Sequence, residues 1–181
     1  RLTARGPVIS GGFRSLKTDK VMTLRFAPFE SMDPCIGLHL LLRAKTTEDA
    51  GHAIEHLNLI SFNMVYGDKD GNIGWRVTGR LPIRSKGDGT IPFVVANSED
   101  NWSGYISFDQ TPHSLNPERG WVGTCNHNTI PRDYPYYYSS HLSPSYRYER
   151  LKQLLDPPSR KSAADHWQYQ RDTLNLMAKR I

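Results

Sequence analysis

The side chains best suited to chemistry lie in a single turn, Asn126-His127-Asn128, between an apolar run and a tyrosine-rich loop. An amide buried in such a turn needs a partner, because an unpaired buried amide costs roughly 1–3 kcal/mol. The residues alone leave two interpretations open. Either an asparagine NH2 group points at an oxyanion, or Asn126 and Asn128 bond their own main chain in an ordinary turn. A basic segment that carries Arg147 and Arg150 follows.

The composition excludes several classes of function. The formal net charge is +5, but basic and acidic residues alternate, so the clustered basic stripe of a nucleic-acid-binding protein is missing. No apolar run reaches the roughly 18 residues that a membrane-spanning helix needs, which argues against a membrane partner. The two cysteines, Cys35 and Cys125, are compatible with a disulfide or with free thiols. The chain starts without Met and without a signal peptide, so we expect residues 1–181 to be one segment of a longer polypeptide, an incomplete domain.

Upstream of the turn, the sequence predicts strands and then a helix. Residues 2–10 and 20–29 contain β-forming residues on either side of a Gly-Gly turn. Thr46 predicts a helix start, because Asp49 stands where a capping box has its acidic partner. The apolar residues that follow recur at helical spacing and predict its buried face: Ala50, Ala53, Ile54 and Leu57.

The segment from Asp68 to Asn72 separates two alternating runs, residues 62–66 and 73–78. Asp70-Gly71 suits a hairpin turn that needs positive φ. The same acidic triplet resembles the start of an EF-hand calcium loop, but Leu81 falls near the place of the glutamate ligand, and strands flank the loop. We therefore predict a hairpin.

Residues 80–119 are rich in proline and glycine and are predicted to be mostly loop, with the aromatic run Trp102–Ile106 covering the sheet. Residues Trp121–Cys125 are predicted to form a strand that enters the asparagine turn. Two helices are then predicted, one capped by Ser143 and one that begins at Ser162 and reaches Met177. The first of them buries Tyr148, Leu151, Leu154 and Leu155. This order of elements indicates the α+β class.

Several segments, in this order and with similar spacing, resemble the β-chain of the penicillin acylase (penicillin amidase) family of N-terminal nucleophile hydrolases. They cover most of the chain: TARGPVI, FNMVYGDKDGNIGW, TGRLPIR, NWSGYISFDQTPHSLNPERGW, GTCNHNTIPRDYPYY, SYRYERLKQLL and the Gln170-x-Asp172 pair.

The resemblance implies part of an αββα sandwich made by autoproteolysis of a secreted precursor, hence a periplasmic or secreted location. It implies an N-terminal Ser that attacks an amide carbonyl with its own α-amino group as base, a group that titrates near pH 7.7–8.0 in about the range that general base catalysis prefers. The oxyanion asparagine of the commoner family motif falls on Asn126, and that of a variant motif on Asn128. Arg147 matches the arginine that supports this asparagine and the substrate region.

The chain also departs from the family pattern. Arg5 replaces the usual histidine, the Ser-Asn start is missing, and Arg1 cannot act as the nucleophile. The resemblance therefore implies an inactive fragment whose partners are the rest of the β-chain, the α-chain and a small amide substrate, with self-association through open strand edges as a further possibility. No cofactor is expected here. The calcium ligand of some members would fall near Tyr138 or Ser139, which offer no carboxylate.

Two other classes of function compete with this interpretation. A non-catalytic α+β binding or interaction module would dock a partner or sugar through the aromatic loop Tyr134–Tyr138. A metal hydrolase would use His39, His52 and His56, but their spacing matches no metal-binding motif.

Overall fold

The computed structural model describes residues 1–15, 17–31, 37–139 and 141–180. Cys125 is a free, half-buried thiol, whereas Cys35 lies outside the described residues. Short helices and short antiparallel strands alternate along the chain, which confirms the α+β prediction.

The described strands form three small antiparallel sheets, with orders β1-β2, β3-β4-β7 and β5-β6. The strands are β1 (Leu2–Thr3), β2 (Gly6–Pro7), β3 (Asn63–Gly67), β4 (Ile73–Val77), β5 (Pro82–Arg84), β6 (Trp102–Tyr105) and β7 (His113–Leu115). The helices are α1 (Ala27–Glu30), α2 (Leu38–Leu41), α3 (Thr47–Glu55), α4 (Tyr146–Leu155), α5 (Ala163–Gln170) and α6 (Leu176–Lys179), with 3-10 turns at Ser98–Asp100 and Phe108–Gln110.

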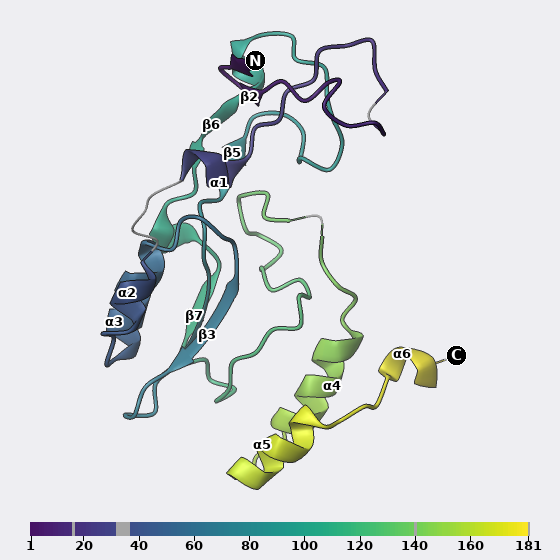
Figure 1. Ribbon diagram of the computed structural model, residues 1–181. Coiled ribbons are helices and arrows are strands. Elements are labelled where there is room, and N and C mark those ends of the chain that lie inside the picture. Colours follow the sequence, from purple (N-terminus) through teal and green to yellow (C-terminus); the bar gives the residue numbers. More distant parts are fainter. Residues whose placement is uncertain (16, 32–36, 140, 181) are drawn as a thin grey trace.

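In Figure 1, α2 and α3 lie on one side of the β3-β4-β7 sheet, and the long segment between β7 and α4 lies on the other. The core forms against this segment. Trp75, Val77, Leu81 and Ile106 are buried together, and Val122, Tyr136 and Tyr138 pack on them. The segment that carries the asparagine turn is therefore held to the sheet by apolar burial, the main favourable contribution to folding.

The predicted hairpin and first helix are confirmed. β3 pairs with β4 over the full length of both strands, from Asn63↔Val77 to Gly67↔Ile73. Asp68 closes the turn by accepting the main-chain N–H groups of Asp70 and Asn72 at 3.0 and 2.9 Å. The helix α3 begins with a complete capping box and buries Ala50, Ala53 and Ile54, whereas Leu57 lies beyond its end and is half-buried.

Several predicted strands are wrong. Residues 2–10 and 20–29 contribute only β1, β2 and an isolated bridge, and the end of the second run is the helix α1, because Pro28 at its start favours helical φ. Trp102–Ile106 is largely the strand β6 rather than a cover over the sheet. Residues 121–125 form no strand within the described chain.

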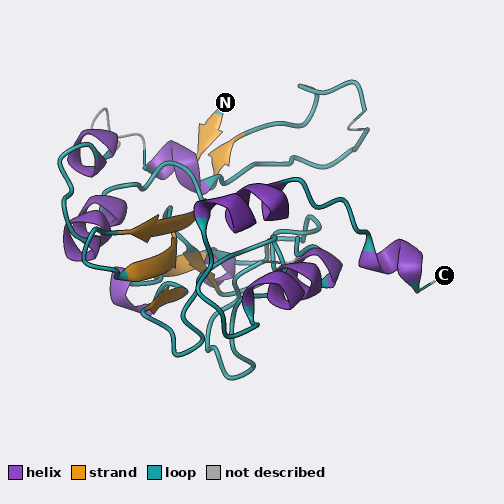
Figure 2. Cartoon of the chain, turned by 90° about the horizontal axis from the view of Figure 1, so that it is seen from below, coloured by secondary structure: helices purple, strands orange, loops and turns teal. Residues whose placement is uncertain are grey.

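The C-terminal helices agree with the prediction in part, and the predicted buried face of Tyr148, Leu151, Leu154 and Leu155 is only half-buried. The helix α4 starts at Tyr146, three residues after Ser143, and its N-cap Ser145 makes no side-chain cap bond. The Ser162 cap of α5 is confirmed as a capping box with Asp165. The predicted last helix is broken, because Asn175 caps a separate helix, α6. Figure 2 shows α6 on the outside of the molecule, at the end of an extended segment.

Candidate functional site: the asparagine turn and its arginine

The turn bends at Asn126, whose φ of 59° is in the left-handed region. Asparagine tolerates this conformation better than most residues, because its short polar side chain can bond locally. Its main chain is held at both ends. The N–H donates to Thr124 Oγ1 at 3.3 Å, and the C=O accepts the N–H of Ser143 at 2.6 Å. The fixed main chain sets the direction in which the Asn126 side chain leaves the turn.

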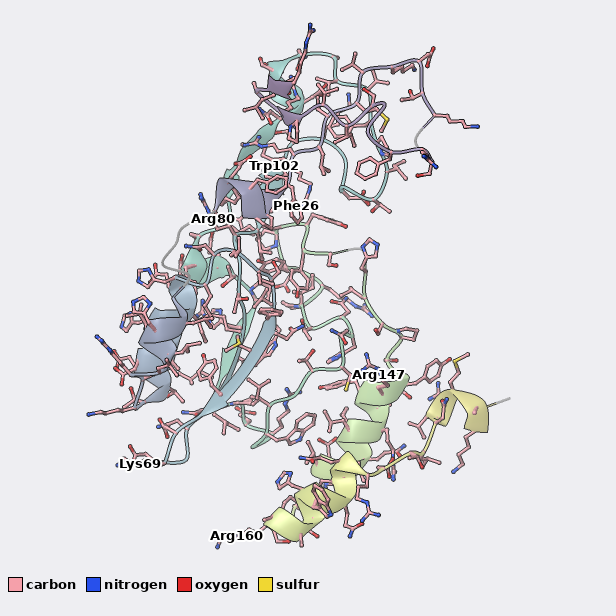
Figure 3. The ribbon with its side chains drawn as sticks, viewed as in Figure 1. Phe26, Lys69, Arg80, Trp102, Arg147 and Arg160 are labelled. Atoms are coloured by element: carbon pink, nitrogen blue, oxygen red, sulfur yellow. The ribbon has the colours of Figure 1, made fainter. Side chains whose placement is uncertain are left out.

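The helix α4 is the platform on which the turn rests. Gly123 lies so close to α4 that a Cβ placed on it would come within 2.9 Å of the Leu151 side chain. One turn earlier on the helix, the Tyr148 ring stacks on His127 with centroids 3.6 Å apart and an angle of 13° between the planes. Figure 3 shows Arg147 at the end of α4 that faces the long segment. Glycine at position 123 therefore permits the close approach on which the other contacts depend.

Arg147 joins α4 to the turn through one nitrogen. Its Nη2 donates to the Cys125 carbonyl at 2.6 Å, to Asn126 Oδ1 at 3.0 Å and to Ser143 Oγ at 3.3 Å. A guanidinium has no acceptor, so the Asn126 atom that faces it must be the oxygen. The Asn126 NH2 group then points away from Arg147, and within the described residues it donates no hydrogen bond. Asn126 is exposed, so this NH2 is open to a ligand.

Asn128 has a different environment. Its Oδ1 accepts the main-chain N–H of Ile130 at 3.2 Å, the pattern of an Asx-turn. This carboxamide is used to close its own loop, as the ordinary-turn interpretation predicts. The two carboxamides therefore have different partners: Asn126 is held by Arg147, and Asn128 by its own main chain.

His127 lies in the predicted turn, but its burial and its contact with α4 were not predicted from the sequence. The side chain is buried and its Nδ1 accepts the Cys125 N–H at 3.4 Å. Burial, followed by the charges of Arg119 and Arg147, holds the pKa of His127 below its usual value. Arg119 also donates to the Tyr148 hydroxyl at 2.6 Å and to the Trp121 carbonyl at 2.9 Å. The only signal in the sequence was a histidine between two asparagines, and the contact with Tyr148 required the fold.

Other residues singled out in the sequence lie outside the turn. Arg150 forms a two-pronged pair with Asp172, at 3.1 and 2.6 Å, and so ties α4 to the segment after α5. The pair lowers the pKa of Asp172. Through this pair, the Gln170-x-Asp172 motif contacts α4 at Arg150 and not the asparagine turn.

The aromatic loop is anchored inward rather than presented as a docking surface. Tyr134 and Tyr136 donate to the carbonyl and to the side-chain oxygen of Gln110, each at 2.9 Å. Tyr136 and Tyr138 pack on the core, and burial raises the pKa of Tyr138. Of the four tyrosines in this loop, only Tyr137 is exposed, whereas Tyr134, Tyr136 and Tyr138 are half-buried.

The described residues contain no cluster of three or more His, Cys, Asp or Glu side chains suited to a metal ion, so His52 and His56 do not belong to one. Within the same part of the chain, no helix combines the length and apolar character needed to cross a bilayer.

Comparisons with known proteins place this chain in a family. The model of the penicillin amidase family matches residues 1–181. The acyl-homoserine lactone acylase QuiP of Pseudomonas fluorescens is 34% identical over 134 residues, which are 74% of this chain and 16% of that protein. The penicillin acylase 2 proenzyme of a Pseudomonas species is 31% identical over 156 residues, 84% of this chain and 20% of that protein.

A solved structure shows the same fold. The thermostable penicillin G acylase from Alcaligenes faecalis aligns with 94% of this chain and 30% of its own, with a TM-score of 0.67 and 24% identity. This match confirms the predicted fold class, a piece of the α+β fold of that enzyme. The chain spans only about a sixth to a fifth of the length of the two curated relatives. The match over its whole length shows that this chain belongs to the penicillin amidase family.

Proposed function

We propose that the chain is the part of a penicillin-acylase-like amidohydrolase that supplies the oxyanion-binding asparagine, Asn126, and its support, Arg147. The supporting observation is the hydrogen bond of 3.0 Å from Arg147 to Asn126 Oδ1, which uses the oxygen of this exposed side chain and leaves its NH2 group to act as a donor. Such an NH2, fixed before the reaction, stabilises the negative charge that develops on a carbonyl oxygen. Its bond to a cation also draws electron density toward the carboxamide oxygen and so strengthens the NH2 as a donor.

The nucleophile would come from another segment of the longer protein, which we call the parent protein. An N-terminal Ser, with its α-amino group as base, would attack the amide carbonyl and form an acyl ester that water then hydrolyses. The relatives are named for acyl-homoserine lactones and for penicillins, both of which carry a side-chain acyl amide. The proposed substrate class is therefore a small amide with a removable acyl group.

The partners in this proposal are the remaining β-chain and the α-chain of the parent protein. Within the described chain, β3 and β7 each have one unpaired edge, and such edges favour pairing with a further strand. The location proposed for the parent protein is periplasmic or secreted. No cofactor is assigned to this segment, and a structural calcium ion would have to be bound by other parts of the parent protein.

The test replaces each asparagine in the full-length parent protein. Asn126→Ala should lower kcat for an acyl-amide reporter by about 100- to 1000-fold with a small change in KM, the usual loss for one oxyanion donor. Asn128→Ala is the matched control, since it removes a carboxamide that only closes its own loop, and its kcat should stay within about threefold of the parent value. Equal kcat values for the two variants would refute the assignment.

Processing must be measured beside turnover, because the same site would act in autoproteolysis. The fraction of precursor cleaved, read from chain masses, separates a variant that never matures from one that matures without activity. If Asn126→Ala does not mature, co-expression of the separate chains, each with its mature N-terminus, bypasses the cleavage. The 181-residue chain alone should show no turnover of the same reporter, because the nucleophile lies elsewhere.

A further inference from the structure

His127 is buried between the two segments that define the site. One face of its ring lies against Tyr148 of α4, and its main chain directly follows Asn126 in the turn. Tyr148 is itself held in place, because its hydroxyl accepts a hydrogen bond of 2.6 Å from Arg119. The imidazole is thus fixed in both position and tilt.

The hydrogen bond from Cys125 N–H defines the protonation state of this ring. A main-chain N–H can only donate, so Nδ1 of His127 must carry a lone pair, and the neutral ring then has its proton on Nε2. This bond spans Asn126, since Cys125 and His127 are its two neighbours. It is therefore a direct constraint on the left-handed bend at Asn126.

We propose, on the basis of the function proposed above, that neutral His127 is a positioning residue for Asn126. The Nδ1 lone pair holds the Cys125 N–H, the Tyr148 stack holds the ring, and together they keep the bend that directs the Asn126 NH2 outward. A second proton on the ring would remove the acceptor and place an N–H against the N–H of Cys125. The bend would lose this constraint, and the NH2 would be less well aimed.

The charges around the ring favour the neutral form. Arg119 from the preceding segment and Arg147 from α4 both act to lower the pKa of His127, in addition to burial. Tyr148 faces the ring with its aromatic face, and its hydroxyl is bonded to Arg119. The groups that face the imidazole are therefore two cations and a neutral phenol, and all of them favour the neutral ring over the protonated one.

The experiment compares two variants of the parent protein, one that keeps the hydrogen-bond acceptor of His127 and one that keeps the aromatic ring. His127→Asn keeps an acceptor near the position of Nδ1 but has no titrating ring, and His127→Phe keeps the stack on Tyr148 without an acceptor. In the unsubstituted enzyme, the acid limb of log kcat against pH should fall more steeply than slope one over the range in which His127 titrates, by about one extra log unit in total, whereas both variants should retain slope one throughout. At pH 8, His127→Phe should lose about tenfold in kcat, roughly the loss of one hydrogen bond, and His127→Asn should recover most of it.

The outcomes distinguish this inference from the proposed function. If Asn126→Ala loses activity while His127→Phe keeps the unsubstituted kcat and the same acid limb, the positioning role is wrong and the oxyanion assignment stands. If Asn126→Ala has no effect, the proposed function fails first. If His127→Phe does not mature, an NMR titration of His127 in the mature enzyme, assigned by its absence in His127→Asn, decides the question. A pKa at or above 6.5, or a proton on Nδ1, would overturn the inference.

Discussion

Arg147 reaches from α4 to Asn126, 21 positions earlier in the chain, and bonds both the carboxamide oxygen, at 3.0 Å, and the preceding carbonyl of Cys125, at 2.6 Å. The arginine therefore fixes the side chain and the main chain of the turn with one group. A helix side chain is a firm point of attachment, because its backbone is held by the helix hydrogen bonds. The orientation of a hydrogen-bond donor such as the Asn126 NH2 group depends on supporting contacts of this kind.

Replacement of Arg147 by Met in the parent protein should lower kcat by about 10- to 100-fold, because a hydrogen bond from a charged donor contributes roughly 1.5–3 kcal/mol. Met keeps much of the length and packing of the side chain and removes the donors. Lys152→Met on the same helix is the control, since Lys152 is exposed and its ion pair with Asp156 is long, at 3.8 Å. A loss of activity of the same size in Lys152→Met would show that the effect comes from α4 in general.

Replacement of Thr46 by Ala should loosen the start of α3. The Thr46 hydroxyl accepts the Asp49 N–H at 3.1 Å, and loss of such a cap costs about 1 kcal/mol. Hydrogen–deuterium exchange of the parent protein should show α3 amides that exchange about fivefold faster, the ratio that about 1 kcal/mol corresponds to. Thr46→Ser keeps the hydroxyl and should exchange like the unsubstituted protein. Equal rates in all three proteins would mean that tertiary packing alone holds the helix.

Asp68 should make the β3-β4 turn sensitive to acid. Its hydrogen bond from the Asn72 side chain, with others from the main chain, lowers the pKa of Asp68 to about 2. In the unfolded chain the pKa of an aspartate is about 3.9. Because the folded-state pKa is lower, the Asp68 carboxylate contributes stability above pH 4, and this stability is lost as the pH falls toward 2. Amide protection factors of the hairpin should therefore differ most between the parent protein and Asp68→Asn above pH 4, and the difference should shrink below it.

Asp70→Asn is the control for this prediction, because it removes one charge from the same turn. The Asp70 carboxylate faces the exposed Lys69 amine at 3.3 Å, a contact that solvent screens. The amide protection factors of the Asp70→Asn variant should follow those of the unsubstituted protein across the same range of pH. A difference between Asp68→Asn and the parent protein that stays constant from pH 6 to 2.5 would contradict the role given to the Asp68 carboxylate.

The sequence was a good guide wherever a short segment determines its own structure. The capping boxes at Thr46 and Ser162 and the turn at Asp70-Gly71 depend on contacts within about four residues, and all three are present in the fold. The strands predicted for residues 2–10 and 20–29 failed, because β-forming residues become a strand only where a partner strand is available. In this chain the two runs meet only at β1, β2 and the Val8–Thr23 bridge.

The candidate site was predictable only in part, for the same reason. The turn itself was singled out from its residues, but the roles of Asn126 and Arg147 came from a family resemblance, because their local patterns fit an ordinary turn and an exposed helix face equally well. The contact between His127 and Tyr148 joins residues 21 positions apart and depends on how α4 lies across the turn. Neither helical periodicity nor a motif predicts how α4 packs on the turn. The burial of a histidine between two exposed asparagines could therefore not be predicted from the sequence.

The contact between Gly123 and Leu151 provides a last prediction, about the distance between the turn and α4. A Cβ at position 123 would lie 2.9 Å from Leu151 Cδ2 and 3.4 Å from the Trp121 ring, so Gly123→Ala must push α4 away or force Leu151 into another rotamer. Overpacking of this kind costs about 1–3 kcal/mol.

Because Arg147 lies one helical turn before Leu151, a displacement of α4 should also weaken the bonds of Arg147 to the turn and lower kcat of the parent protein. Leu151→Val shortens the side chain opposite position 123. Combined with Gly123→Ala, it should restore part of the lost kcat, whereas Leu151→Val alone should change kcat little. Losses that simply add in the double variant would show that Gly123 and Leu151 act independently, and that the close approach of α4 does not set the aim of Asn126.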